Sequence, residues 1–292
     1  MTYDDVMKLA LERGFYFPSS EIYADAQAGF WEYGPSGVSL KNKFLELWRR
    51  ELVRRDKMIE IDGSQIMAKS VFDASGHLAS FADPIVRCKK CKSTHRADKI
   101  IVEVSQIEIP ESADLDEFDK IIVEKNIKCP KCYGDFENAK KFNLMFEIGI
   151  GPEGESAFLR PETCQSIFVD FPRIFKTMRG KLPLGIAQTG KSFRNEIAPR
   201  QSLLRLREFY QAEIEVFCNP AKLSDLGKFS EIKDTKIRIQ IDDEIKSMTC
   251  KEAVDSQTIP NEFVAYYLGS VSYTHLRAHE TRHDLVCRLL LE

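Results

Sequence analysis

Residues 193–217 bring together side chains that could bind a charged ligand and act on it. The segment reads FRNEIAPRQSLLRLREFYQAEIEVF, in which arginines, carboxylates and aromatic rings recur at short spacings. Such groups are costly to bury together unless a ligand or a partner compensates their charges. A nucleotide would do so, because guanidinium groups bind phosphates, a ring stacks on a base, and a carboxylate accepts a hydrogen bond from an amine.

Side-chain alternation in this segment predicts two strands joined by a polar, basic loop. We expect Arg194 and Glu196 on one face of the first strand. The functional face of the second strand is expected to hold five side chains: Arg207, Phe209, Gln211, Glu213 and Glu215. Its opposite face is expected to pack through four others: Tyr210, Ala212, Ile214 and Val216. Alternation alone leaves open an antiparallel hairpin whose charged face is only solvated.

Four of the eight cysteines form two Cys-x-x-Cys pairs, which favour a metal site. The pairs are Cys88 with Cys91 and Cys129 with Cys132. Each spacing suits a knuckle that presents two thiolates to one metal, and four sulfurs favour tetrahedral Zn²⁺. Four reduced cysteines without metal are the alternative. A thioredoxin-like redox pair is less favoured, because no βαβ pattern surrounds either pair.

The bulk properties indicate a globular protein with a local positive field. The chain has 292 residues, 43% of them hydrophobic, and a formal net charge of −3. This charge argues against indiscriminate nucleic-acid binding, yet residues 173–207 hold nine Lys or Arg against one acid. No apolar run suits a membrane span and no signal peptide is recognisable at the start, so we expect a cytoplasmic protein with no membrane partner.

Hydrophobic spacing predicts the elements that position these residues. A short helix is expected over 6–13, a turn over 30–35, a long surface helix over 37–56 and a strand over 57–61. Between 83 and 141 the composition changes, and residues 101–128 carry eight acids against three lysines. We therefore expect a domain inserted into the main fold, with the cysteine pairs near its two ends.

FRNE, a basic loop and then REFxxAE resemble motif 2 of class II aminoacyl-tRNA synthetases. FLRPETCQSIF, GKLPLGIAQTGKSFRNEIAPR and LRLREFYQAEIEVF together resemble glycyl-tRNA synthetases of the archaeal and eukaryotic type. The resemblance implies an α+β fold, in which an antiparallel sheet flanked by helices is incomplete and carries an inserted zinc-ribbon-like subdomain. It divides the chain into 1–82 (catalytic, motif 1 region), 83–141 (insertion with zinc knuckles), 142–269 (catalytic, motif 2) and 270–292.

For the ATP site, the resemblance implies that Arg194 is catalytic, holding the α-phosphate and the charge that develops on it. Phe209 would stack on adenine, and Glu196 would bind the base or order the loop. The full set of implied ATP contacts is Arg194, Asn195, Glu196, Leu204, Arg205, Leu206, Arg207, Glu208 and Phe209.

For glycine, the resemblance implies a pocket in which carboxylates hold the ammonium group and small volume excludes larger side chains. Arg96, in the segment THRAD, would contact the substrate. The implied set is Arg96, Glu162, Phe209, Tyr210, Gln211, Ala212 and Glu213. We interpret His77, in the segment SGH, as structural, because one histidine beside glycine is poor evidence of catalysis.

The function implied is that of a glycine–tRNA ligase, which activates glycine with ATP and Mg²⁺ and transfers it to the acceptor end of tRNA(Gly). The family is expected to be a homodimer. No glycine-rich third motif and no anticodon-binding domain are recognisable, so we expect an N-terminal fragment that is inactive by itself. A non-catalytic synthetase-like module that binds nucleotide or RNA, and another class II ligase, are the alternatives.

Residues 270–292 resemble no part of this family. They hold three of the five histidines, at positions 275, 279 and 283. We interpret the segment as a foreign tail of translated vector or adapter sequence. A metal site formed by the three histidines is the alternative.

Overall fold

The computed structural model describes residues 2–110, 113–197, 199, 202–223, 227–241 and 244–273. The chain divides into two compact units. The first contains the described residues up to Ser39 together with Asp62–Ser166 and Thr189–Ala212. The second contains Leu40–Ile61, Ile167–Gln188 and the described residues from Glu213 onward.

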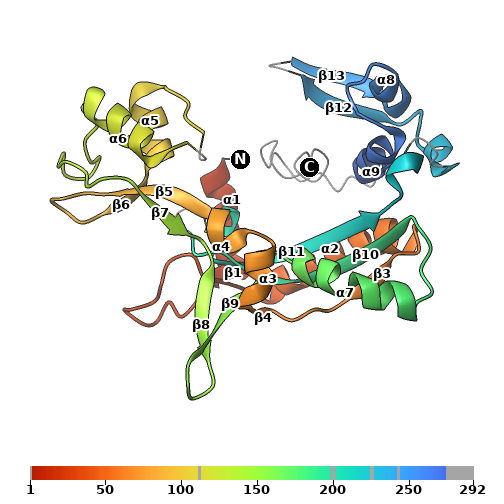
Figure 1. The fold of residues 1–292 in the computed structure, drawn as a ribbon, viewed down its shortest axis with the longest axis horizontal. Coiled ribbons are helices and arrows are strands. Elements are labelled where there is room, and N and C mark those ends of the chain that lie inside the picture. Colours follow the sequence, from red (N-terminus) through yellow and green to blue (C-terminus); the bar gives the residue numbers. More distant parts are fainter. Residues whose placement is uncertain are drawn as a thin grey trace. The chain divides into compact units, whose positions relative to one another are not determined.

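The described residues form helices and mainly antiparallel strands (Figure 1). The helices are α1 (Tyr3–Glu12), α2 (Pro35–Trp48), α3 (Lys69–Ala74), α4 (His77–Ser80), α5 (Ala97–Ser105), α6 (Leu115–Glu124), α7 (Cys164–Thr177), α8 (Cys250–Asp255) and α9 (Glu262–Tyr273). A π-helix covers Arg49–Arg54, and short 3-10 turns cover Ser202–Leu204, Pro220–Lys222 and Gly227–Glu231. The strands are β1 (Tyr16–Pro18), β2 (Trp31–Tyr33), β3 (Ile59–Ile61), β4 (Ile66–Ala68), β5 (Ala82–Arg87), β6 (Thr94–Arg96), β7 (Lys140–Asn143), β8 (Phe146–Ile150), β9 (Glu155–Leu159), β10 (Leu184–Phe193), β11 (Glu208–Phe217), β12 (Lys236–Ile241) and β13 (Glu244–Thr249).

The N-terminal elements match the predicted pattern except at the predicted turn. Helix α1 begins after a capping box in which Thr2 and Asp5 satisfy each other's backbone N–H groups. The turn predicted over 30–35 is wrong, because Trp31–Tyr33 forms strand β2 and pairs with β1. The edge-on contact of Trp31 with Tyr16, with ring centroids 5.3 Å apart, favours this pairing. The predicted long helix is observed as α2 followed directly by the π-helix.

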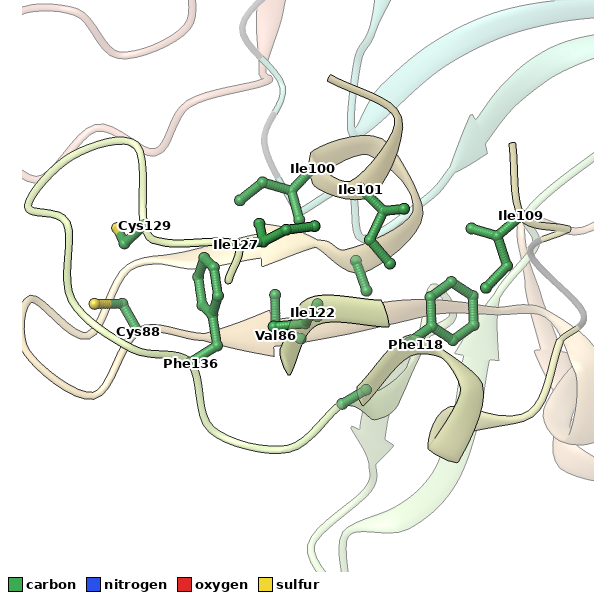
Figure 2. Packing of buried hydrophobic residues seen from close by; sticks show 12 residues of the cluster. Val86, Cys88, Ile100, Ile101, Ile109, Phe118, Ile122, Ile127, Cys129 and Phe136 are labelled. Carbon is green, nitrogen blue, oxygen red and sulfur yellow. The ribbon is translucent and has the colours of Figure 1, made fainter. Parts of the chain in front are cut away.

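The described residues from Ala82 to Asn143 fold around a core of their own. Strands β6, β5 and β7 form an antiparallel sheet in that order, with Asp83 opposite Phe142. Helix α5 packs on this sheet and contacts α6. Figure 2 shows Cys88 and Cys129 at one end of the core, and Ile109 and Phe118 at the other.

Two further sheets carry the residues of the candidate site. Strands β4, β9 and β8 form an antiparallel sheet, and Phe72, Met145 and Phe158 are buried against it. Strands β11, β10 and β3 form the other. Here β10 pairs with β3 in parallel, which the expectation of an antiparallel sheet did not include. More than a hundred residues separate these strands, which leaves room for the crossover that a parallel pair requires.

Candidate functional site

The two cysteine pairs form matched turns. In the first, Lys92 N–H donates to Cys88 O (3.1 Å) and Cys88 N–H donates to Ser93 O (2.9 Å). In the second, Tyr133 N–H donates to Cys129 O (2.8 Å) and Cys129 N–H donates to Gly134 O (3.0 Å). Lys92 and Tyr133, which follow the second cysteine of each pair, both have left-handed backbone conformations. The same local fold therefore presents two thiols from each knuckle.

The four sulfur atoms lie at the spacing of a tetrahedral metal site. All four lie within 4.8 Å of one another, with 3.5 Å between the sulfurs of Cys88 and Cys132 and 3.7 Å between those of Cys91 and Cys129. A tetrahedron with Zn–S bonds of about 2.3 Å has S–S edges of about 3.8 Å. The cluster is therefore compatible with zinc.

A glycine lets the second knuckle approach the thiols closely. A Cβ atom on Gly134 would lie 3.1 Å from the sulfur of Cys88 and 3.3 Å from that of Cys132. On the other side, the Ser93 hydroxyl lies 3.0 Å from the sulfur of Cys91 and 2.9 Å from Nε2 of His95. Hydrogen bonds from Ser93 lower the pKa of the Cys91 thiol to about 6. His95 is 3.7 Å from the sulfur of Cys129 and is not one of the four clustered ligands.

The second candidate centre lies where β10 ends. The prediction that Arg194 and Glu196 share one face of a strand is wrong, because β10 stops at Phe193. The chain leaves the strand here because its backbone finds other partners. Arg194 N–H donates to Arg207 O (2.9 Å), and Asn195 N–H donates to Leu144 O (2.7 Å). The segment after β10 is thereby fixed to the residues just before β8 and β11.

A fully buried arginine supports this end of β10. Arg160 is 0% exposed, and its guanidinium donates to the carbonyl oxygens of Lys191 (2.9 Å) and Gly63 (3.0 Å). Its own backbone carbonyl accepts from Phe193 N–H (2.9 Å). A side chain at Gly190 would collide with the Arg160 guanidinium. The glycine therefore allows Arg160 to link three segments beneath the site.

The Arg194 side chain lies beside two rings and a carboxylate. Its Nε donates to Pro161 O at 3.1 Å, and its guanidinium carbon lies 5.4 Å from the ring centroids of both Phe81 and Phe209. An Nη atom lies 3.9 Å from Oε2 of Glu162, at the outer limit of an ion pair. A cation, two aromatic rings and an anion thus meet at one place, an arrangement suited to a charged organic ligand.

Glu162 is largely buried and remains ionised. Burial raises the pKa of its carboxyl, but hydrogen bonds from His77 and Cys164 and the positive charges of His77 and Arg194 outweigh this and lower the pKa to about 2. Oε1 accepts from Gln165 Nε2 at 2.7 Å and from the Cys164 thiol at 3.2 Å. It also lies 3.1 Å from His77 Nε2.

Sequence reasoning missed the position of His77 at this site. Gly76 has φ of 77°, a left-handed conformation that turns the chain between α3 and α4 and makes His77 the first residue of α4. The signal available in the sequence was the SGH turn. Its 85-residue separation from Glu162 in the sequence hid the contact.

The residues predicted to contact ATP on the loop and at the start of β11 are anchored to one another. Arg205 Nε donates to a Glu196 carboxylate oxygen at 2.6 Å, and Arg207 Nε donates to Glu196 O at 3.0 Å. Glu208 pairs with Lys191 on the adjoining strand. Leu206 is buried, whereas Leu204 is 71% exposed.

Strand β11 does not have one apolar and one charged face. Tyr210, expected to pack, is 39% exposed, and Lys191 lies over its ring at 5.9 Å. Gln211, expected on the ligand face, accepts a hydrogen bond from Ser192 at 2.8 Å. Ala212 and Glu213 are half-buried, and Glu213 is the first β11 residue of the second unit. The twist and the pairing with β10 decide burial here more than alternation does.

Arg96 is held by two nearby carboxylates. Its guanidinium donates to both oxygens of Asp98 (3.0 and 2.8 Å) and lies 3.2 Å from Asp83. Both acids are buried. Its predicted contact with glycine stays a prediction.

The predicted tail falls largely outside the described residues, and so do its three histidines. Residues 270–273 are described, and they complete α9, in which Ser270 is buried. Within the described part of the chain, no helix has both the length and the apolar character needed to cross a membrane.

Comparison with known proteins places these residues in a family context. A family model described as the tRNA synthetase class II core domain (G, H, P, S and T) matches residues 140–236. The chain is 42% identical over 282 residues to the glycine–tRNA ligase of Methanothrix thermoacetophila, covering 94% of this chain and 48% of the relative. It is 45% identical over 273 residues to that of Pyrococcus abyssi, covering 91% and 47%. The chain therefore spans about half the length of the curated relatives it matches.

A solved structure described as the RNA binding domain of threonyl-tRNA synthetase from Cryptosporidium parvum Iowa II aligns with a TM-score of 0.45 and 19% identity. It covers 77% of this chain and 39% of that one. The resemblance to glycine–tRNA ligases rests on sequence and is confirmed over nine-tenths of the chain.

Proposed function

We propose that this chain, similar over most of its length to glycine–tRNA ligases, carries the ATP and glycine subsites of such an enzyme. In the reaction, an oxygen of the glycine carboxylate attacks the α-phosphorus of ATP. The bond to the bridging oxygen breaks, and glycyl-adenylate and pyrophosphate form. A hydroxyl at the acceptor end of tRNA(Gly) then attacks the glycyl carbonyl, and AMP leaves.

One observation carries the proposal: Arg194 lies over Phe209 and beside the ionised Glu162. Arg194 would bind the α-phosphate and stabilise the charge that develops on it, while the Phe209 ring stacks on adenine. Glu162 would bind the ammonium group of glycine. These three groups are the ones that the proposed reaction would use, and their proximity supports the proposal.

We propose roles for the remaining predicted contacts with ATP and glycine. The loop residues held by Glu196 would reach the outer phosphates, whose charge Mg²⁺ neutralises when it is bound. Tyr210, Gln211, Ala212 and Glu213 would line the glycine pocket, with Arg96 contributing from the insertion. Small pocket volume, rather than affinity for a side chain, would select glycine.

The finer fold assignment rests on the family match and on the knuckles. We assign the sheets that carry the site to a class II synthetase core, and the segment around the four cysteines to a zinc-ribbon-like insertion. Cys88, Cys91, Cys129 and Cys132 would hold one structural Zn²⁺. The metal would fix the two knuckles to each other.

The proposed partners follow from the same function. The basic side chains between 173 and 207 suit the acceptor end of tRNA(Gly). Helix α2 leaves Leu40 and Phe44 exposed, which suits a homodimer contact. We assign the protein to the cytoplasm, where its substrates for translation are found.

The test is glycine-dependent exchange of labelled pyrophosphate into ATP. We expect exchange by the chain extended through its native reading frame, and at least about a tenfold lower rate by the 292-residue chain, because losing part of the charge around the triphosphate removes much of the rate. Arg194→Ala in the extended protein should lower the rate by about 10²–10³-fold. Arg238→Ala, at an exposed position in β12, is the matched control and should leave it unchanged.

An exchange rate of the 292-residue chain within about tenfold of that of the extended protein would contradict the expectation that this chain holds only part of the ATP site. Exchange by neither protein would instead indicate a non-catalytic module that binds nucleotide or RNA.

A further inference from the structure

The two carboxylate oxygens of Glu162 have different surroundings. Three side chains converge on Oε1: Gln165 Nε2 at 2.7 Å, His77 Nε2 at 3.1 Å and the Cys164 thiol at 3.2 Å. Among the described residues, the one cationic group near Oε2 is the guanidinium of Arg194, 3.9 Å away. One oxygen is therefore saturated with donors, whereas the other keeps its capacity to accept.

The donors on Oε1 are themselves fixed in orientation. An ionised carboxylate can only accept, so His77 must carry a proton on Nε2. Its Nδ1 lies 2.8 Å from the Ser75 hydroxyl, which completes a chain from Ser75 through the ring to Glu162. Phe72 and Phe81 pack on the His77 ring, with centroids 6.1 and 5.5 Å away. The imidazole therefore cannot easily turn away from the carboxylate.

The same reasoning fixes the amide of Gln165. Its N–H group must face the carboxylate, so its oxygen points away from that carboxylate. Gln165 is buried, and its Oε1 has no hydrogen-bond partner among the described residues. A buried acceptor of this kind is costly unless a donor reaches it. Gln165 therefore offers an acceptor oxygen, Oε1, in addition to the N–H group that holds Glu162.

We propose that His77 and Gln165 are positioning residues that hold Oε1 of Glu162, so that Oε2 is directed to the ammonium group of the amino-acid substrate. The inference rests on the proposed function, because it states how that site recognises glycine. Glu162 binds the ammonium group, and His77 acts through Glu162 without touching the reacting atoms. Without the hydrogen bonds from His77 and Gln165, the carboxylate of Glu162 can rotate or move toward Arg194.

The test compares two stable mimics of the reaction intermediate in binding to the full 292-residue chain. A glycyl-sulfamoyl adenosine carries the ammonium group, and its acetyl counterpart lacks it. The ratio of their dissociation constants, measured by calorimetry, reports ammonium recognition separately from nucleotide binding. ATP affinity is measured on the same samples.

His77→Phe keeps a ring against Phe72 and Phe81 but removes the donor. We expect the preference for the ammonium-bearing mimic to fall by about tenfold, while the affinity for the acetyl mimic stays within about twofold. His77→Gln, which restores an N–H group, should recover part of the preference. A purely structural role would weaken both mimics equally.

Gln165→Leu is the second variant, and it decides the question where His77→Phe fails to fold. It should also lower the preference for the ammonium-bearing mimic over the acetyl mimic. Ser80→Ala is the control in helix α4, because the Ser80 hydroxyl is exposed and, among the described residues, bonds only to Gly76 O. It should leave the ratio unchanged.

An unchanged ratio in a folded His77→Phe or Gln165→Leu variant would overturn the inference. Wild-type protein that binds ATP but shows no preference between the mimics would overturn it while leaving the proposed nucleotide site intact. Wild-type protein that binds neither ATP nor either mimic would overturn the inference and the proposed function together.

Discussion

Removing the metal proposed for the four cysteines should unfold the insertion and leave the neighbouring β4–β9–β8 sheet folded. The magnitude follows from the geometry of the thiols. In a regular tetrahedron, the S–S distances of 3.5 and 3.7 Å correspond to centre-to-sulfur distances of about 2.1 and 2.3 Å. These two values lie within about 0.2 Å of a Zn–S bond, so the two cysteine pairs are already close enough to share one metal.

The core of the insertion is too small to replace what the metal contributes. It comprises a dozen buried residues, two of which are cysteines of the cluster. A core of this size rarely supplies more than about 3–5 kcal/mol, whereas structural zinc contributes about 10–16 kcal/mol of apparent binding free energy in small peptides. Chelation should therefore unfold the insertion, because the free energy of zinc binding exceeds the free energy that the packed core supplies.

Elemental analysis of protein expressed with zinc should give one zinc per chain, and hydrogen exchange with and without chelator should change in 83–141. Cys129→Ser should abolish stoichiometric zinc. Cys250→Ser is the matched control, because Cys250 is equally buried but lies in the second unit, and zinc content should not change. Less than about half a zinc per chain, or exchange rates in the insertion that chelation leaves unaltered, would refute the reasoning.

Three further predictions concern packing and charge. Gly190→Ala forces the buried guanidinium of Arg160 to move and should cost about 1–3 kcal/mol of unfolding free energy in urea titrations. Because the pKa of Glu162 is lowered, its ionised carboxylate should stabilise the protein above pH 4.5, the ordinary pKa of a glutamate. This contribution should be lost as the pH falls toward 2. Its upper limit is about 3 kcal/mol, and Glu162→Gln should remove that pH dependence. Tyr266→Phe removes a buried hydroxyl that donates to Asp56 at 2.8 Å and should lower the unfolding free energy by about 1–3 kcal/mol, a loss that an unchanged denaturation midpoint would contradict.

Local patterns predicted the parts of this molecule that depend on nearby residues. The Cys-x-x-Cys spacing identified all four clustered thiols, because each knuckle is built within six residues. The helix over 37–56 was predictable from its apolar stripe. Features fixed by distant contacts were not predictable in this way. Strand β10 ends at Phe193 because the backbone N–H groups that follow donate to the carbonyl oxygens of Leu144 and Arg207. Side-chain alternation carries no information about either partner.

The geometry around Arg194 explains how two opposite charges can stay available to ligands at one site. A direct salt bridge between Arg194 and Glu162 would satisfy both groups and leave little charge for a substrate. The guanidinium is instead fixed by Pro161 O and by two aromatic rings, which hold it 3.9 Å from the carboxylate. The carboxylate is fixed from its other side by the donors on Oε1. Under the proposed function, the guanidinium would bind a phosphate and the carboxylate would bind an ammonium group, each while held by the contacts that now fix it.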